Sequence, residues 1–150
     1  MTPRQCALSL SLLVLAGCGL VARTQRMFGG ALPLEVTISA GANQASPVAV
    51  DLLVVYDQQV LDRLLALSAR EWFQQREQWK RDHPGAFEAW GWEWVPGQAV
   101  PRQVAEYRAG AKAALVFADY LTPGTHRVQL DPHAPARLIL GEGTLAVEPL

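Results

Sequence analysis

The sequence predicts a mainly β protein, an antiparallel β-sandwich of seven or eight strands with a helical insertion after the second strand. Three observations predict this fold. Apolar and polar residues alternate with period two in several short runs, the first of which covers residues 34–39. Turns rich in glycine and proline separate these runs. A helical spacing of apolar residues occurs in one stretch, about residues 58–83.

The first two predicted strands flank a turn-rich loop at residues 41–47. The strand before it, residues 34–39, has one apolar and one polar face. The strand after it, residues 48–56, is apolar and β-branched, and Asp51 is its only charged residue. Such a run is typical of a central strand that is covered on both faces.

The insertion is predicted to form two helices, about residues 60–67 and 69–82. Ser68 and Glu71 have the spacing of a capping box, in which each side chain bonds a backbone N–H group of the first helical turn. The sequence His83-Pro84-Gly85 ends the second helix.

Alternation returns after the helices, and Trp90, Trp92 and Trp94 share one face of the next predicted strand. Tryptophans in such an arrangement belong to a core or an interface in most proteins, while an exposed set would stack on a sugar. A strand within residues 98–107 is expected at a sheet edge because it contains Pro101. The remaining strands are predicted at residues 113–120, 126–130, 136–140 and 144–148.

The N-terminus has the features of a bacterial lipoprotein signal. A positive residue, Arg4, precedes an apolar run that ends in Leu15-Ala16-Gly17-Cys18, a lipobox. The sequence therefore predicts a signal peptide at residues 1–17, lipidation of Cys18, a tether at residues 18–33 and the sandwich domain at residues 34–150. Gly19 follows the cysteine in place of an aspartate, which favours the periplasmic face of the outer membrane.

Processing would leave 12 Lys and Arg against 14 Asp and Glu, a balance that does not indicate nucleic-acid binding. Cys6 would be lost and Cys18 capped by lipid, so neither a disulfide nor a thiolate site is expected. The three histidines lack the spacing of a metal site, and a pair of His126 with Asp131 would have no nucleophile to activate. We expect no enzymatic activity, cofactor or metal.

The order of several features resembles the TssJ family, the outer-membrane lipoproteins of type VI secretion systems. These features are the lipobox, a loop with Asn43 followed by Ser46-Pro47-Val48, a long strand ending in Val55-Tyr56, the helical segment, Val95-Pro96-Gly97 and the strand Ala114 to Tyr120. The resemblance covers most of the chain after Cys18.

The resemblance implies a transthyretin-like sandwich without enzymatic activity. It implies binding to the periplasmic C-terminal part of the inner-membrane protein TssM, within a complex that also contains TssL. In the family the loop between the first two strands contacts TssM, and here Asn43 and Gln44 would supply polar contacts. That loop comprises Ala40, Gly41, Ala42, Asn43, Gln44, Ala45, Ser46 and Pro47. On length alone it is equally a plain turn.

Two other functions fit the same residues. A glycan- or small-ligand-binding lipoprotein would use Trp90, Trp92 and Trp94 as a stacking surface. A periplasmic chaperone or inhibitor would pair an exposed strand edge with a strand of its partner.

Overall fold

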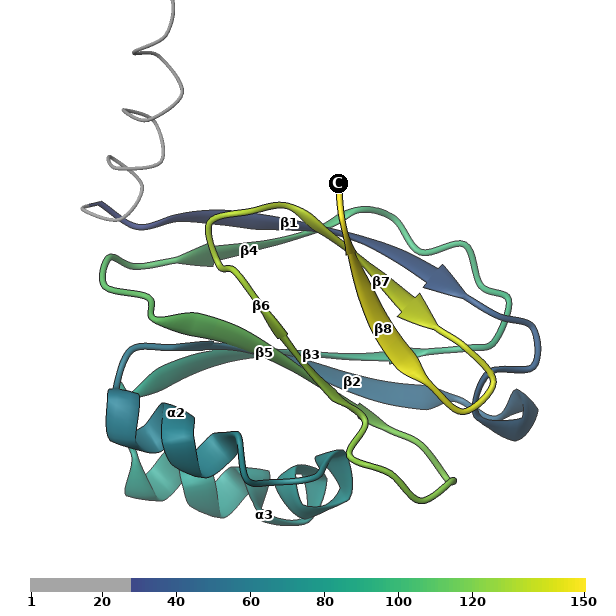
Figure 1. Ribbon diagram of the computed structural model, residues 1–150, viewed down its shortest axis with the longest axis horizontal. Helices are drawn as coiled ribbons and strands as arrows, with labels where there is room; N and C mark the ends of the chain where they lie inside the picture. Colours follow the sequence, from purple (N-terminus) through teal and green to yellow (C-terminus); the bar gives the residue numbers. More distant parts are fainter. Residues whose placement is uncertain (1–27) are drawn as a thin grey trace, which may run out of the picture.

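The computed structural model describes residues 28–150, and Figure 1 shows two stacked sheets with two helices beneath them. The predicted signal peptide, Cys18 and the first part of the tether lie outside the described residues. The strands are β1 (Gly30–Ile38), β2 (Val48–Val55), β3 (Phe87–Trp94), β4 (Gln103–Tyr107), β5 (Ala113–Asp119), β6 (Arg127–Leu130), β7 (Ala136–Leu140) and β8 (Leu145–Pro149). The helices are η1 (Ala42–Ala45), α2 (Gln58–Leu64) and α3 (Ala69–Asp82).

The strands form two four-stranded sheets, ordered β4-β1-β7-β8 and β3-β2-β5-β6. The predicted β-sandwich with a helical insertion after the second strand is confirmed. One pairing differs from the antiparallel prediction, because β1 and β7 run parallel, with Leu34 opposite Ala136 and Ile38 opposite Leu140. Alternation identifies the buried face of a strand but not the direction of its neighbour, so the sequence pattern does not predict this parallel pairing.

The first strand begins at Gly30, four residues before the predicted start at Leu34. Residues 30–33 pair with β4, where Leu32 lies opposite Ala105. Leu32 is fully buried between the sheets. The predicted tether, residues 18–33, is therefore too long at its C-terminal end, because these residues form part of the sandwich.

The main core fills the space between the two sheets. Alternate residues of the inner strands supply it, as the period-two pattern predicted. Trp94 belongs to this core with 4% of its surface exposed, and Trp90 and Trp92 pack against it in partly buried positions. The indoles of Trp92 and Trp94 stack with ring centroids 5.4 Å apart. A flat stacking surface for sugars made from all three tryptophans is therefore wrong, because their common face points into the sandwich.

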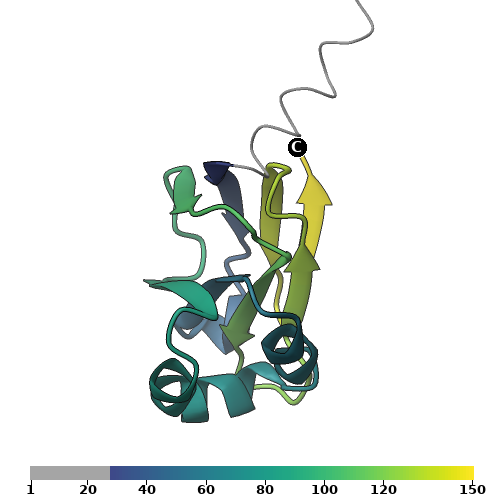
Figure 2. The same ribbon diagram turned by 90° about the vertical axis from the view of Figure 1, so that its left-hand side faces the viewer.

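A second core lies between the helices and the β3-β2-β5-β6 sheet, whose outer face they cover (Figure 2). Trp72 of α3 is fully buried there and stacks on Phe117, with ring centroids 5.4 Å apart. Its indole N–H donates to Asp51 Oδ2 at 2.9 Å, and Arg76 pairs with the same carboxylate at 3.2 Å. Asp51, the one charge predicted in the central strand, thus joins the helix to the sheet.

The position opposite Asp51 on β3 is occupied by Gly91. A Cβ atom at Gly91 would lie 2.8 Å from Asp51 Oδ1. The glycine therefore leaves room for the carboxylate that bonds Trp72 and Arg76.

The helix boundaries follow their caps. α3 begins after Ser68, and the predicted capping box is present, since Ser68 N–H donates to Glu71 Oε2 at 2.7 Å and Glu71 N–H donates to Ser68 Oγ at 3.3 Å. α2 begins two residues before its predicted start because the Asp57 side chain accepts a hydrogen bond from the Val60 N–H group.

Candidate functional site

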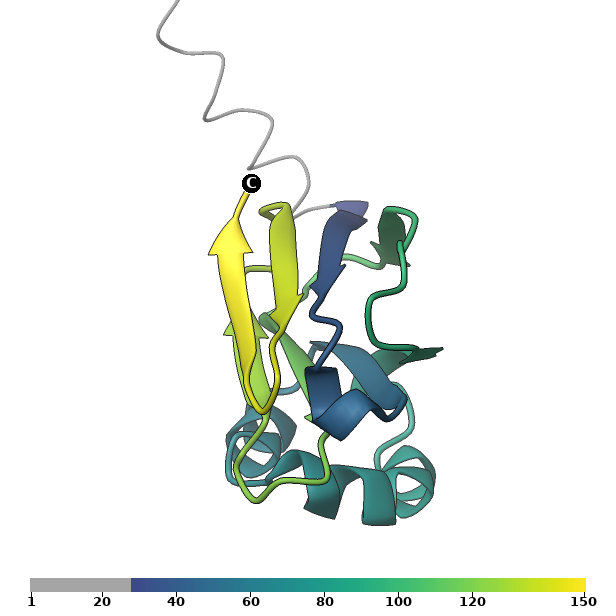
Figure 3. The same cartoon turned by 90° about the vertical axis from the view of Figure 1, so that its right-hand side faces the viewer.

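Four connections meet at one end of the sandwich, which we call the loop end. They are residues 39–47, the first part of the β3–β4 connection at residues 95–98, residues 120–126 and residues 141–144. Figure 3 faces this end, and Figure 1 shows that β1 begins at the opposite end. β1 has nine residues, so at roughly 3.3 Å per residue it separates the two ends by about 30 Å. The predicted contact loop thus lies on the side of the domain away from its N-terminal connection.

The β1–β2 connection, predicted as a turn-rich loop, is a tight left-handed turn. Asn43, Gln44 and Ala45 have φ angles of 49°, 57° and 58°. Asparagine adopts this conformation more readily than most residues, whereas alanine and glutamine seldom do. The turn is held from outside, because the Asn43 N–H group donates to the Glu142 carbonyl oxygen at 2.9 Å.

The Asn43 side chain lies inside the loop end, with 2% of its surface exposed. Its Nδ2 donates to the Pro47 carbonyl at 2.8 Å, and its Oδ1 accepts from the Leu121 N–H group at 2.6 Å. The prediction that Asn43 supplies a polar contact to a partner is therefore corrected, since its amide already joins two connections. Gln44 is exposed, as are Ala40, Ala45 and Pro47, whereas Ala42 is buried and Gly41 and Ser46 are half-buried.

The β5–β6 connection places a large apolar side chain beside this turn. Leu121 has 56% of its surface exposed. Its position is fixed by the Asn43 amide and by Arg70 of α3, whose guanidinium donates to the carbonyl oxygens of Tyr120 and Leu121 at 3.2 and 3.4 Å. Leu121 is thus exposed on a backbone that is held from two sides.

Tyr120 ties the same connection to the β7–β8 turn. Its buried hydroxyl donates toward the carbonyl oxygens of Thr144 and Gly141, which lie 3.0 and 3.1 Å away. Burial raises the pKa of Tyr120 to about 12, which widens the pH range over which the hydroxyl stays protonated and can donate.

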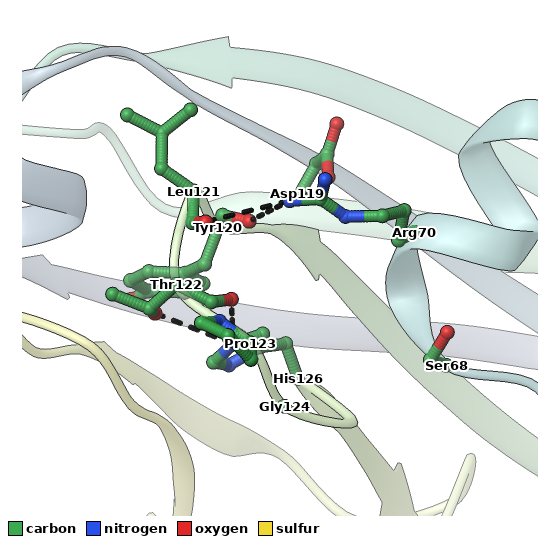
Figure 4. A pocket seen from close by; sticks show the side chains of 9 residues that line it. All are labelled: Ser68, Arg70, Asp119, Tyr120, Leu121, Thr122, Pro123, Gly124 and His126. Carbon is green, nitrogen blue, oxygen red and sulfur yellow. Dashed lines mark hydrogen bonds between the residues drawn. The ribbon is translucent and has the colours of Figure 1, made fainter.

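A hollow of about 310 Å³ opens between this connection and the start of α3 (Figure 4). In Figure 4, His126 lies under Thr122, with its Nε2 2.9 Å from the Thr122 carbonyl oxygen. The hollow is lined by Ser68, Arg70, Asp119, Tyr120, Leu121, Thr122, Pro123, Gly124 and His126. Arg70 and His126 contact backbone carbonyl oxygens of the β5–β6 connection. These contacts hold the surface of the hollow in place.

The histidines do not come together. His126 contacts Thr122, whereas Asp131 accepts a bond from the His133 backbone N–H group, so the conceivable His126–Asp131 pair does not form. Within residues 28–150, no group of three His, Cys, Asp or Glu side chains is placed to hold a metal ion. Over the same residues, the helices are too short or too polar to cross a membrane.

Sequence reasoning missed Leu121 and Arg70. The only signal was an apolar residue directly before the Thr122-Pro123-Gly124 turn, a position that does not distinguish a buried from an exposed side chain. The contact between Arg70 and the carbonyl of Leu121 joins residues 51 positions apart, a separation that no local pattern reports.

We expect Asn43→Gly to loosen the loop end without unfolding the domain. Glycine keeps the left-handed backbone but removes both bonds of the amide, so the Leu121 N–H group loses its acceptor. Amide hydrogen exchange at Leu121 should become at least about tenfold faster, because the free energy of local opening at this amide should fall by about 1.5 kcal/mol. The amide of Val116 in β5 serves as the internal control and should exchange as in the wild type; equal protection of Leu121 in both proteins would contradict the assignment.

No family model and no curated protein sequence matches the chain. Solved structures do match. The protein Lip of Serratia marcescens, described as a membrane-bound component of the type VI secretion system, superposes with a TM-score of 0.62 at 16% identity, over 79% of this chain and 97% of Lip. The type VI secretion lipoprotein TssJ1 of Pseudomonas aeruginosa gives a TM-score of 0.62 at 16% identity, over 81% of this chain and 96% of TssJ1.

The chain has the TssJ fold. A chain from a structure described as the TssM C-terminal domain from EAEC also matches, with a TM-score of 0.61 at 20% identity over 81% of this chain and 99% of that one. The predicted resemblance to TssJ is thus confirmed at the level of the fold. The match covers about four-fifths of the chain and almost all of each relative.

Proposed function

We propose that this chain is a TssJ-type lipoprotein, a non-enzymatic scaffold of a type VI secretion membrane complex. Lipid on Cys18 would anchor it to the periplasmic face of the outer membrane, and its loop end would bind the periplasmic domain of TssM in a complex with TssL. The TssJ fold carries this proposal, together with the predicted lipobox at residues 15–18.

The direction of β1 supports this role. The chain enters the domain at Gly30, at the end opposite the loop end (Figure 1). A protein anchored at Cys18 would therefore attach through one end and present the other end to the periplasm. A scaffold that holds a partner from another membrane needs its two attachment points on different faces of the domain.

The loop end has the properties of a preorganised binding surface. Gln44 and Leu121 are exposed side chains on backbone that hydrogen bonds hold in place. An exposed aliphatic side chain on a fixed backbone loses little conformational freedom when a partner covers it. We assign Leu121 as the apolar anchor of the interface and Gln44 as its polar neighbour; the other exposed residues of the β1–β2 connection are Ala40, Ala45 and Pro47.

Leu121→Asp tests this interface. The carboxylate would be buried without a partner in the complex but solvated in the free protein, so binding to TssM should weaken by at least about tenfold. The affinity of the detergent-solubilised chain for the periplasmic domain of TssM from the same organism would be measured by interferometry. Val104→Asp is the matched control, because Val104 is similarly exposed, at 53%, but lies on β4 away from the loop end.

Each result of this comparison has one meaning. Weaker binding of Leu121→Asp with unchanged binding of Val104→Asp supports the loop end as the interface. Equal binding by both variants places the contact elsewhere, and no binding by the wild-type chain at micromolar TssM contradicts the proposed function.

A further inference from the structure

The edge strand β3 differs from the other three edges of the sandwich. β3 lies at the edge of its sheet and has eight residues, whereas the edge strands β4, β6 and β8 have five, four and five. All eight residues of β3 pair with β2 in one continuous register, without a bulge. β3 also lacks the proline and lysine residues that commonly protect sheet edges.

The backbone of β3 has a free row of hydrogen-bonding groups. The Tyr56 N–H group donates to the Ala86 carbonyl at 2.8 Å, one step beyond the pair of Val55 with Phe87. Bonded pairs alternate in an antiparallel ladder, so the even-numbered residues of β3 bond β2 and the odd-numbered residues point outward. Among residues 28–150, no backbone hydrogen bond outside the strand pairings involves residues 87, 89, 91 or 93.

The side chains along this edge leave it accessible. Ala89, Gly91 and Glu93 are exposed. Ala89 and Gly91 are the two smallest residue types, so their side chains do not block an approaching strand from the backbone of β3. On the other face of the strand, Trp90 is only partly buried and has apolar surface left to cover.

We propose that β3 pairs with β3 of a second copy of this chain, antiparallel and centred on Trp90. In that register Ala89 bonds Gly91 of the second copy, so the outward groups of both strands are satisfied. The two Trp90 side chains lie directly opposite each other, and aromatic pairs stabilise such positions. The result is one eight-stranded sheet that runs through both copies.

The charges on β3 favour this register. Glu88 lies opposite Trp92 of the second copy, and Glu93 lies opposite Phe87, so no like charges face each other directly. Glu88 is also engaged within its own copy, since it accepts a 2.5 Å bond from the Tyr56 hydroxyl and lies 3.8 Å from Arg108. The strand is thus complementary to itself.

The test is the mass of the detergent-solubilised full chain in native mass spectrometry at about 10 µM, a concentration at which a dimer with a Kd of about 1 µM is mostly formed. We expect the mass of two chains for the wild type and of one chain for Ala89→Pro. Proline at residue 89 removes an outward N–H group but spares the bonds of Glu88 and Trp90 to β2. Circular dichroism would show that Ala89→Pro remains folded.

A cross-linking measurement keeps the test decisive if Ala89→Pro does not fold. Ala89→Cys treated with a short bis-maleimide should give a covalent dimer, whereas Ala146→Cys, exposed on β8, and the wild-type chain should not. A monomeric wild type without Ala89→Cys dimers overturns the proposal. A dimer that persists in Ala89→Pro also overturns the proposal. The proposal is overturned as well if Ala89→Cys cross-links in cells only to a different protein and not to a second copy of this chain.

Discussion

Replacing Trp72 with alanine is expected to lower the free energy of unfolding by about 3 to 5 kcal/mol. Trp72 is fully buried, stacks on Phe117 and forms a T-shaped contact with Phe87, whose ring centroid lies 5.8 Å away. Alanine would leave a cavity between α3 and the sheet and would remove the indole donor from Asp51. Chemical denaturation measures the change, with one m-value (the slope of the free energy of unfolding against denaturant concentration) fitted to both proteins.

Trp72→Phe separates the two causes. Phenylalanine keeps most of the ring but has no N–H group for Asp51, so it should cost about 1 to 2 kcal/mol. The exposed residue Gln75 on the same helix is the matched site for a control, and Gln75→Ala should change stability by less than about 0.5 kcal/mol. A loss below 1 kcal/mol for Trp72→Ala would show that α3 does not depend on this contact.

Cys18→Ser is expected to move the protein almost completely from the membrane fraction to the soluble fraction of the cell. A serine hydroxyl cannot carry the thioether-linked lipid, and two or more acyl chains supply most of the membrane affinity of a lipoprotein. The thermal unfolding of the domain should not change, because the fold described by residues 28–150 does not include Cys18.

The other cysteine supplies the control. Cys6 lies within the predicted signal peptide, so Cys6→Ser should leave the protein in the membrane fraction. Membrane retention of Cys18→Ser, or a mature protein whose Cys18 carries no lipid by mass spectrometry, would remove the anchor from the proposed function.

The parts of the fold that the sequence predicted are those set by local chemistry. The alternation of apolar residues located the strands, and the pair of Ser68 with Glu71 located the start of α3 at the residue observed. The predicted first strand starts four residues later than the observed one because Gly30 and Pro33 are poor strand formers. Their pairing with β4 outweighs that preference.

The candidate site depends on contacts that no local pattern records. The amide of Asn43 bonds a backbone group 78 residues away, and this contact turns an apparent surface asparagine into a buried one. Leu121 is only the first residue of a predicted turn in the sequence, whereas in the structure the bonds from Asn43 and Arg70 fix the backbone on which its side chain is exposed. Long-range hydrogen bonds of this kind require the fold to be known first.

Site-specific photo-cross-linking in living cells tests the central claim most directly. A benzophenone amino acid would replace either Gln44, at the loop end, or Lys112, an exposed residue near the opposite end of the sandwich. We expect irradiation to give a covalent adduct with TssM from position 44 and none from position 112. An adduct from position 112 alone, or none with TssM from either position, would contradict the account.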